Sequence, residues 1–196
     1  MITIQKKRYL KNTIPILVVG MLLPQILMAA DFRGVVWGDD MEAVKIKETE
    51  KLIGDHQRNL IYQGRLAGVK MYIVYEFRNR RLIEGSYHNQ SRHADKNEFI
   101  RDHEILKDLL QKKYGSPVLD RAIWTNDTYR ADASQWGTAI SLGHLSYVTE
   151  WETYNTKISA VLGGKDSNIQ HVVKYTEKRS EEKEQKEREK RILEKL

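Results

Sequence analysis

The chain has 196 residues, of which 33 are Lys or Arg, 27 are Asp or Glu and none is Cys. Without cysteine it has no disulfide, no thiol nucleophile and no cysteine metal ligand, so its core must hold by packing alone. Its net charge of +6 invites a nucleic-acid hypothesis, but the position of the excess charge argues against one.

The first thirty residues have the layout of a secretory signal peptide. An apolar run from Ile14 to Ala30 follows four basic residues, Lys6, Lys7, Arg8 and Lys11. This order predicts that residues 1–30 are cleaved just before Asp31 and that the product is periplasmic or secreted. The alternative is an uncleaved membrane anchor. The run is shorter than the roughly 20 apolar residues that cross a bilayer, and Pro15 and Pro24 interrupt it.

Removal of the signal peptide changes the charge of the protein. Residues 1–30 hold four basic and no acidic residues, so 29 Lys and Arg remain against 27 Asp and Glu, a net charge of +2. These remaining charges are interspersed and form no basic track. We therefore expect no nucleic-acid partner, and no membrane span after cleavage.

Residues 31–93 form the first of two units with one plan, a helix followed by an antiparallel meander. After a short strand at 32–37, Asp39 and Glu42 have capping-box spacing and predict a helix that runs to about Leu52 and is closed by Gly54. Strands are predicted at 59–63, 69–77 and 81–87. In the middle strand, alternate residues from 69 to 77 are apolar, so one face belongs to the core and the other to solvent.

Residues 94–176 repeat this plan. Asp95 and Glu98 again have capping-box spacing, and the helix that follows carries one apolar stripe, formed by Phe99, His103, Leu106, Leu110 and Tyr114. A strand at 122–124, a short helix at 135–142 and strands at 145–151, 157–162 and 169–175 come next. Trp151 lies on the apolar face of its strand and is expected in the core. The pattern predicts an α+β fold with helices on one side of an antiparallel sheet.

Residues 177–196 are expected to form a charged, solvent-exposed helix. This tail has no Gly, Pro or aromatic residue, and acidic residues precede basic ones at i,i+4 spacing. Its only apolar side chains are Ile192, Leu193 and Leu196. Either the tail only adds solubility, or these three residues contact a partner.

In organisation, the chain resembles small exported helix-plus-meander proteins. The stretch from Phe32 to Val44, FRGVVWGDDMEAV, is similar to the strand–glycine–helix entry of such modules. Residues 32–176 resemble the tandem halves of the β-lactamase inhibitory protein and, unit by unit, the outer-membrane assembly lipoprotein BamE. The chain lacks the lipid-bearing cysteine of the one and the disulfides of the other. The resemblance implies a binding role for the exposed face of the sheet.

Two groups of residues suggest catalytic or metal chemistry, but neither has a convincing pattern. Ser141 lies in a sequence one glycine short of a nucleophile elbow, yet no parallel α/β pattern surrounds it and His144 is too close to act as the usual base. A second group, His88, His93, Asp95 and Glu98, has no recognised metal-ligand spacing. We interpret it as a polar linker with a helix cap.

Further carboxylates and glycines have equally plain interpretations. Glu98, Asp102 and Glu104 lie along one helix, but paired acids catalyse only where a pocket separates their pKa values. Gly163, Gly164 and Lys165 lack the flanking strand and helix of a phosphate-binding loop and indicate a hairpin turn. We therefore predict no catalytic, metal or cofactor site, and no enzyme.

The sequence favours an exported, non-catalytic protein-binding or envelope-associated module. Tyr72, on the polar side of its strand, is the candidate contact residue of the sheet, and the partner is expected to be an envelope protein or another macromolecule. The alternative is a periplasmic protein that binds a small molecule or metal in a pocket between the units. An exposed aromatic face favours the first function, and an enclosed polar pocket near His88 and His93 the second.

Overall fold

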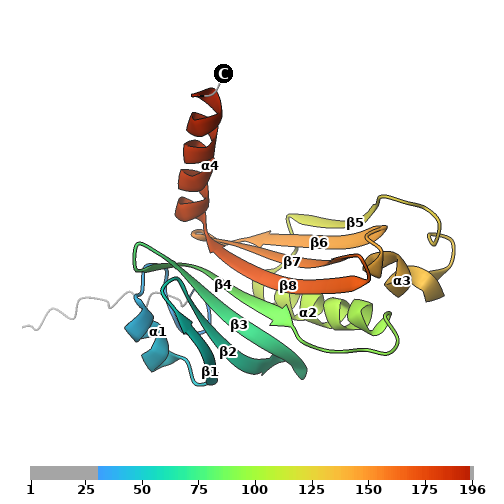
Figure 1. Ribbon diagram of the computed structural model, residues 1–196, viewed down its shortest axis with the longest axis horizontal. Helices are drawn as coiled ribbons and strands as arrows, with labels where there is room; N and C mark the ends of the chain where they lie inside the picture. The colour runs from blue at the N-terminus through green and yellow to red at the C-terminus, as the bar shows by residue number, and fades with distance from the viewer. Residues whose placement is uncertain (1–30, 195–196) are drawn as a thin grey trace, which may run out of the picture.

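Eight strands of one antiparallel sheet and four α-helices make up residues 31–194, the part of the chain that the computed structural model describes (Figure 1). The first half contains α1 (Met41–Lys47), β1 (Lys51–His56), β2 (Asn59–Leu66), β3 (Val69–Arg78) and β4 (Arg81–Asn89). The second half contains α2 (Glu98–Tyr114), β5 (Leu119–Trp124), α3 (Trp136–Ser141), β6 (Leu145–Glu152), β7 (Thr156–Lys165), β8 (Asn168–Glu177) and α4 (Lys178–Leu193). The predicted signal peptide at 1–30 and the predicted contact residue Leu196 lie outside the described residues.

The two halves of the sheet are joined by their last strands, β4 and β8. Each half forms its own meander, and the sheet order is β1-β2-β3-β4-β8-β7-β6-β5. At the seam between the halves, β4 pairs antiparallel with β8, with His88 opposite Val172. The predicted α+β class and antiparallel meanders are confirmed, and the two meanders form one continuous sheet.

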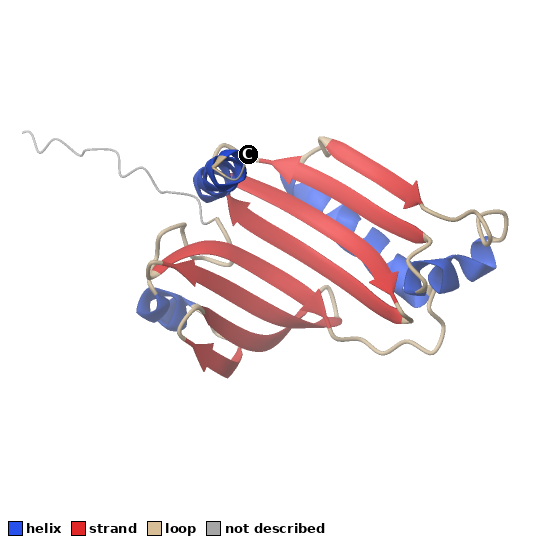
Figure 2. Ribbon diagram, turned by 45° about the horizontal axis from the view of Figure 1, so that its top comes forward, coloured by secondary structure: helices blue, strands red, loops and turns tan. Residues whose placement is uncertain are grey.

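Helices α1, α2 and α3 cover one face of this sheet, whereas α4 projects from the opposite side (Figures 1 and 2). The alternating burial along β3 explains this arrangement. Val69, Met71, Ile73, Tyr75 and Phe77 are buried on one side of the strand, and Lys70, Tyr72 and Glu76 on the other side are exposed. The predicted core and solvent faces of this strand are therefore confirmed.

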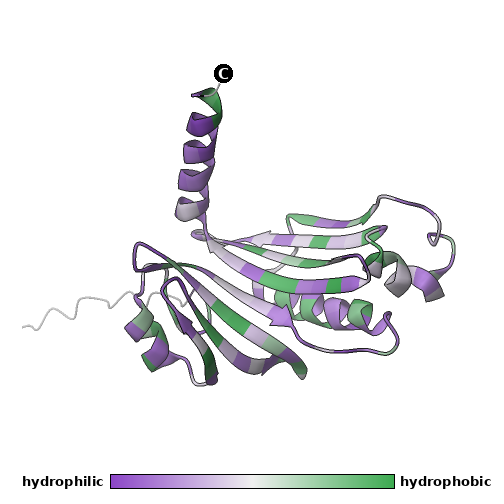
Figure 3. Ribbon diagram, viewed as in Figure 1, coloured by the Kyte–Doolittle hydropathy of each residue, from purple (hydrophilic) through white to green (hydrophobic). Residues whose placement is uncertain are grey.

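Helix α4 continues directly from β8 and remains exposed along its length. Polar residues cover it almost completely, and the apolar residues gather at its tip (Figure 3). Ile192 is 55% exposed and Leu193 is 64% exposed. The structure confirms the predicted charged helix and places Glu177, the first residue of the predicted tail, at the end of β8.

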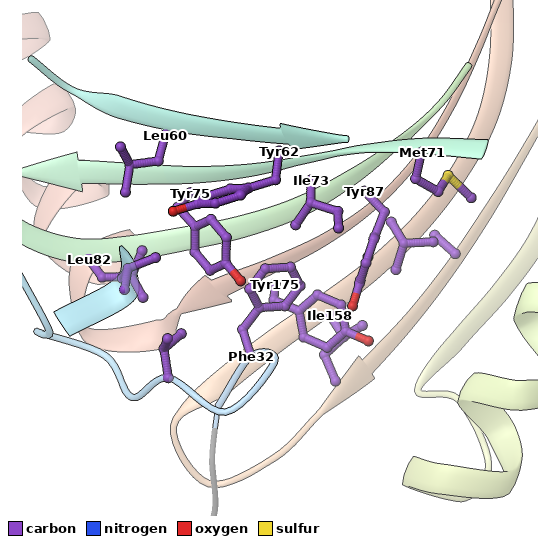
Figure 4. Packing of buried hydrophobic residues seen from close by; sticks show 14 of the residues in the cluster. Phe32, Leu60, Tyr62, Met71, Ile73, Tyr75, Leu82, Tyr87, Ile158 and Tyr175 are labelled. Carbon is purple, nitrogen blue, oxygen red and sulfur yellow. The ribbon is translucent and has the colours of Figure 1, made fainter. Parts of the chain in front are cut away.

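A cluster of aromatic rings forms the centre of the core (Figure 4). The ring of Phe32 lies 5.2 Å from that of Tyr75, 5.1 Å from that of Tyr87 and 5.0 Å from that of Tyr175. These partners come from β3, β4 and β8, so Phe32 joins both halves of the sheet. Gly85 is required below the ring, because a Cβ there would lie 2.2 Å from a Phe32 carbon.

Helix α2 packs with the stripe that the sequence predicts. His103, Leu106 and Leu110 are buried, and Phe99 and Tyr114 are partly buried. Leu106 and Leu110 belong to the same cluster as Phe32, so the two halves share one core. Trp151 is 1% exposed, as predicted, and its Nε1 donates to the carbonyl of Gly115 at 3.0 Å.

The start of the first half differs from the prediction. Residues 32–37 form no strand, because Arg33 and Gly34 adopt positive φ angles and turn the chain so that Phe32 bridges to Val35. The cap of α1 is Asp40, whose carboxylate accepts from the backbone N–H of Ala43 at 2.8 Å. Asp39 instead accepts from Val36 N–H and Lys47.

Helix α1 also ends earlier than predicted. Glu48 adopts an extended conformation and turns its carboxylate into the core, which stops the helix after Lys47. The following segment forms β1, so Leu52 and Gly54 lie in a strand. This edge strand is short and mostly exposed, with a register shift between Leu52 and Gly54, and it therefore lacks the alternation from which strands are predicted.

The predicted cap of α2 is displaced by two residues. Asn97 occupies the cap position, and Asp95 accepts from the Asn97 backbone N–H at 2.9 Å. The side chain of Asn97 is used elsewhere, because it donates to Ser134 O and accepts from Gly137 N–H. These two hydrogen bonds connect the start of α2 to the start of α3.

Candidate partner-binding face

The uncovered face is the side of the sheet opposite α1, α2 and α3. One cross-strand row on this face runs over seven strands, from β2 to β5. Its members stand opposite one another in register: Gln63, Tyr72, His88, Val172, Val161, Val148 and Arg121. The central five are aromatic or apolar, which gives the uncovered face an apolar row that no helix covers.

Tyr72 is the large aromatic side chain of this row. It is 37% exposed, and the alternation of β3 directs it away from the core. Lys70 and Val74 lie two residues away on the same side of the strand, so the ring stands between a charge and an apolar side chain. An amphipathic ring in such a position can contact both apolar and polar groups of a partner.

Helix α4 stands at one end of the uncovered face and is held there by ion pairs. Lys178 lies 2.7 Å from Glu152, and Lys157 lies 3.9 Å from Glu181. Arg78 also pairs with Glu184. The predicted contact residues Ile192 and Leu193 are at the far tip of this helix, away from Tyr72, and no contact in the described structure brings the two sites together.

Two carboxylates of the uncovered face near α4 have lysine partners. Glu84 pairs with Lys174 at 3.2 Å, and Glu150 pairs with Lys157 at 3.3 Å. Burial raises the pKa of Glu84, and the nearby Lys174 acts in the opposite direction. Lysines therefore neutralise these two carboxylates.

Two open hollows lie at the end of the uncovered face away from α4. One has a volume of about 470 Å³ and is lined by Arg65, Gly68, Lys70, Gln90, Ser91, Arg92 and His93. The other, also about 470 Å³, lies over the seam between β4 and β8 and shares Gln90, Ser91 and Arg92 with the first. Neither is lined by an Asp or Glu.

The structure separates the histidines that sequence grouped together. His88 points to the uncovered face and lies 3.0 Å from the hydroxyl of Ser86, whereas Nε2 of His93 lies 2.8 Å from the carboxylate of Asp102 on α2. Burial, followed by the charge of Lys174, lowers the pKa of His88. In residues 31–194 no three His, Cys, Asp or Glu side chains are placed to hold a metal ion.

A buried histidine pair between α2 and β8 was not anticipated. Nδ1 of His103 lies 3.4 Å from Nε2 of His171, and the Asn89 amide bridges His171 to Asp102. Nε2 of His103 has no hydrogen-bond partner among residues 31–194. Burial lowers the pKa of His103 to about 3, with help from His171 and Lys107, and burial lowers the pKa of His171 to about 4. The helical spacing of His103 indicates a core position, but its partner is 68 residues away in the chain.

Ser141 is buried at the end of α3 and is not exposed for attack on a substrate. Its hydroxyl donates to the carbonyl of Thr138 at 2.9 Å and accepts from Lys96 at 2.9 Å. His144 makes no hydrogen bond to it; the His144 ring stacks on Tyr129 instead. The serine thus connects α3 to the segment before α2.

The remaining candidates have structural contacts. Glu98 pairs with Arg101, and Glu104 pairs with Lys107 at 3.0 Å. Gly163 and Gly164 lie within β7, and the hairpin turn itself is formed by Asp166 and Ser167, both with positive φ. The predicted hairpin is present, two residues beyond the glycines.

Neither a protein-family model, nor a curated protein, nor a solved structure matches this chain. Among the helices of residues 31–194, none has the length and apolarity needed to cross a membrane.

Proposed function

We propose that this protein is exported to the cell envelope and acts there, without catalysis, by binding another protein through the uncovered face of its sheet. The observation that carries the proposal is the row of apolar and aromatic side chains from Tyr72 through His88 and Val172 to Val148, which the helices leave open. Antiparallel sheets commonly expose one face to water, and such a face is normally polar. An aromatic side chain within an exposed apolar row favours a contact surface.

Export is tested by the N-terminus of the mature protein. Expression in a Gram-negative host and recovery from the periplasm should give a chain that begins at Asp31, because small residues precede this position at the end of the apolar run. Mass spectrometry of the intact protein measures it. A chain that retains Met1 and fractionates with membranes would support the anchor instead.

Binding through the uncovered face is tested by Tyr72→Ala. Once a partner has been isolated from periplasmic extract by cross-linking, this substitution should weaken the complex by more than about 1 kcal/mol, or more than about fivefold in Kd, because it removes the largest aromatic side chain of the row. Calorimetry measures the Kd, and urea unfolding checks that the variant remains folded. Tyr154→Ala is the matched control, since Tyr154 is fully exposed in the β6–β7 turn, outside the uncovered face.

A truncation after Glu177 separates the two predicted contact sites. It removes α4 with Ile192 and Leu193 and leaves β8 complete. Binding that survives this truncation and is weakened by Tyr72→Ala assigns the contact to the sheet. Binding that is lost on truncation and unaffected by Tyr72→Ala would move the contact to the tail.

A further inference from the structure

The end of the uncovered face away from α4 is basic. Arg65 on β2, Lys70 on β3 and Arg92 after β4 are all exposed and line the first of the two hollows described above, and Arg92 also lines the second. We call these three residues the basic end. Lys70 is two residues from Tyr72 on the same side of β3, so the basic end is continuous with the apolar row.

In the described part of the chain, the positive charges of the basic end are not neutralised. The ion pairs found in residues 31–194 include none of its three side chains. Arg65 makes one hydrogen bond, from its Nη1 to the Gly68 carbonyl at 2.7 Å, which holds it over the hollow. At the opposite end of the face, Glu84, Glu150 and Glu152 each have a lysine partner. The basic end is therefore a group of exposed cations that carry no ion pair within residues 31–194.

We infer that the partner segment bound on the uncovered face is acidic, with Asp or Glu side chains at the basic end and apolar side chains on the row that contains Tyr72. This inference rests on the proposed function and specifies the chemistry of its partner. Carboxylates fit the planar guanidinium groups of Arg65 and Arg92, and exposed charges of one sign select partners of the opposite sign. Apolar side chains of the partner segment would pack on Val172 and Val161 of the row.

The same face is poorly suited to the other common polyanions. A nucleic acid that extended from the basic end along the face would meet Glu76 and Glu84, which stand opposite each other on β3 and β4. A flat anionic bilayer would meet α4, whose sixteen residues span about 24 Å and rise on the uncovered side (Figure 1). A protein segment can lie beside α4 and reach both the apolar row and the basic end.

The inference is tested by selection of short random peptides, displayed on phage, against the whole mature protein. We expect selected peptides to be enriched in Asp and Glu next to apolar residues. Synthetic copies of them should bind less tightly when NaCl is raised from about 0.05 M to about 0.5 M, since salt screens exposed charges. Vesicles of phosphatidylglycerol and a DNA duplex serve as competing anionic probes.

Two charge-reversal variants locate the contact. Lys70→Glu with Arg92→Glu should weaken binding of a selected peptide by about tenfold or more. Lys112→Glu with Lys113→Glu makes the same change in net charge on α2, on the other side of the sheet, and should leave the Kd within about twofold. Thermal unfolding establishes that both variants are folded before their Kd values are compared.

The outcomes separate this inference from the proposed function. One outcome would overturn the acidic partner and leave the binding face in place. In it, the selected peptides carry no excess of acidic residues, and their binding depends on Tyr72 but is unchanged by Lys70→Glu with Arg92→Glu. If neither Tyr72→Ala nor the charge reversal changes the binding of the peptides, the binding face would be overturned as well. Binding of the DNA duplex or of the vesicles that depends on Lys70 and Arg92, without any acidic peptide, would replace the protein partner with a nucleic acid or a membrane.

Discussion

Acidification from pH 7 to pH 5 is expected to destabilise the protein by about 2 kcal/mol for each of the two buried histidines, His103 and His171. Their pKa values are lowered to about 3 and about 4, against about 6.5 in an unfolded chain. A base with a lowered pKa in the folded state stays neutral there, while the unfolded chain gains protons below about pH 6.5. The stability that the two neutral histidines contribute is therefore fully present above about pH 6.5. It is lost as the pH falls toward their pKa values in the folded protein.

The charged and titratable groups around the pair do not reverse this direction. Lys107 opposes protonation of His103, whereas Asp102 favours protonation of His171 less strongly than burial opposes it. The Tyr147 ring lies 5.7 Å from that of His103 and supplies no charge near neutral pH, because burial raises its pKa. His93 is held on Asp102 at the outer end of the network.

Urea unfolding at pH 7, 6 and 5 measures the effect. A variant with His103→Leu and His171→Leu should lose most of the pH dependence over this range, even if its stability at pH 7 differs. His56→Gln is the control, since His56 is exposed on the edge strand β1, and it should retain the wild-type slope. An unchanged slope in the double variant would show that the pair does not remain neutral in the folded state.

Arg33→Ala is expected to cost about 3 to 5 kcal/mol of unfolding free energy, the loss typical of a buried ion pair that is left with one charge. Arg33 donates twice to Glu48, at 2.7 and 2.8 Å, and the Glu48 side chain is only 1% exposed. Burial alone would raise the pKa of Glu48, but the hydrogen bonds from Arg33 and Tyr75 outweigh it and lower the pKa to about 2. Without Arg33 the carboxylate stays buried and uncompensated.

A second substitution distinguishes this cause from a general loss of packing. In the Arg33→Ala background, Glu48→Gln removes the buried charge and keeps an acceptor for the Tyr75 hydroxyl, so it should restore part of the lost stability. Arg101→Ala breaks an exposed pair with Glu98 and should cost less than about 1 kcal/mol. Urea unfolding at pH 7 measures all three. Equal losses from Arg33→Ala and Arg101→Ala would contradict the buried-pair explanation.

The fold was predictable where side-chain periodicity decides it. The alternation of Val69 to Phe77 and the helical stripe of Leu106 and Leu110 follow from local sequence, because the period of each pattern matches the geometry of its element. The end of α1 was not predictable in this way. Glu48 is compatible with a helix, and only its pairing with Arg33 and Tyr75, from distant parts of the chain, turns it inward.

The candidate site was predictable only in part. The exposure of Tyr72 follows from its position in an alternating strand. The row that surrounds it does not, because Val172, Val161 and Val148 meet Tyr72 only through the register of β4 and β8. The basic end is likewise formed by three segments, and in the sequence its cations are indistinguishable from the many others.

The position of β8 has a consequence for the order in which the chain can assemble. This last strand lies between β4 and β7, near the middle of the sheet. Until it has been made, β4 and β7 each present an open edge with unpaired backbone groups, a template for pairing with other chains. The early half can form its own hairpins quickly, but closure of the seam waits for a strand far along the chain. A chain that stops before Asn168 therefore has four open edges in place of two, so termination or proteolysis that removes β8 should yield an aggregation-prone product rather than a shortened working protein.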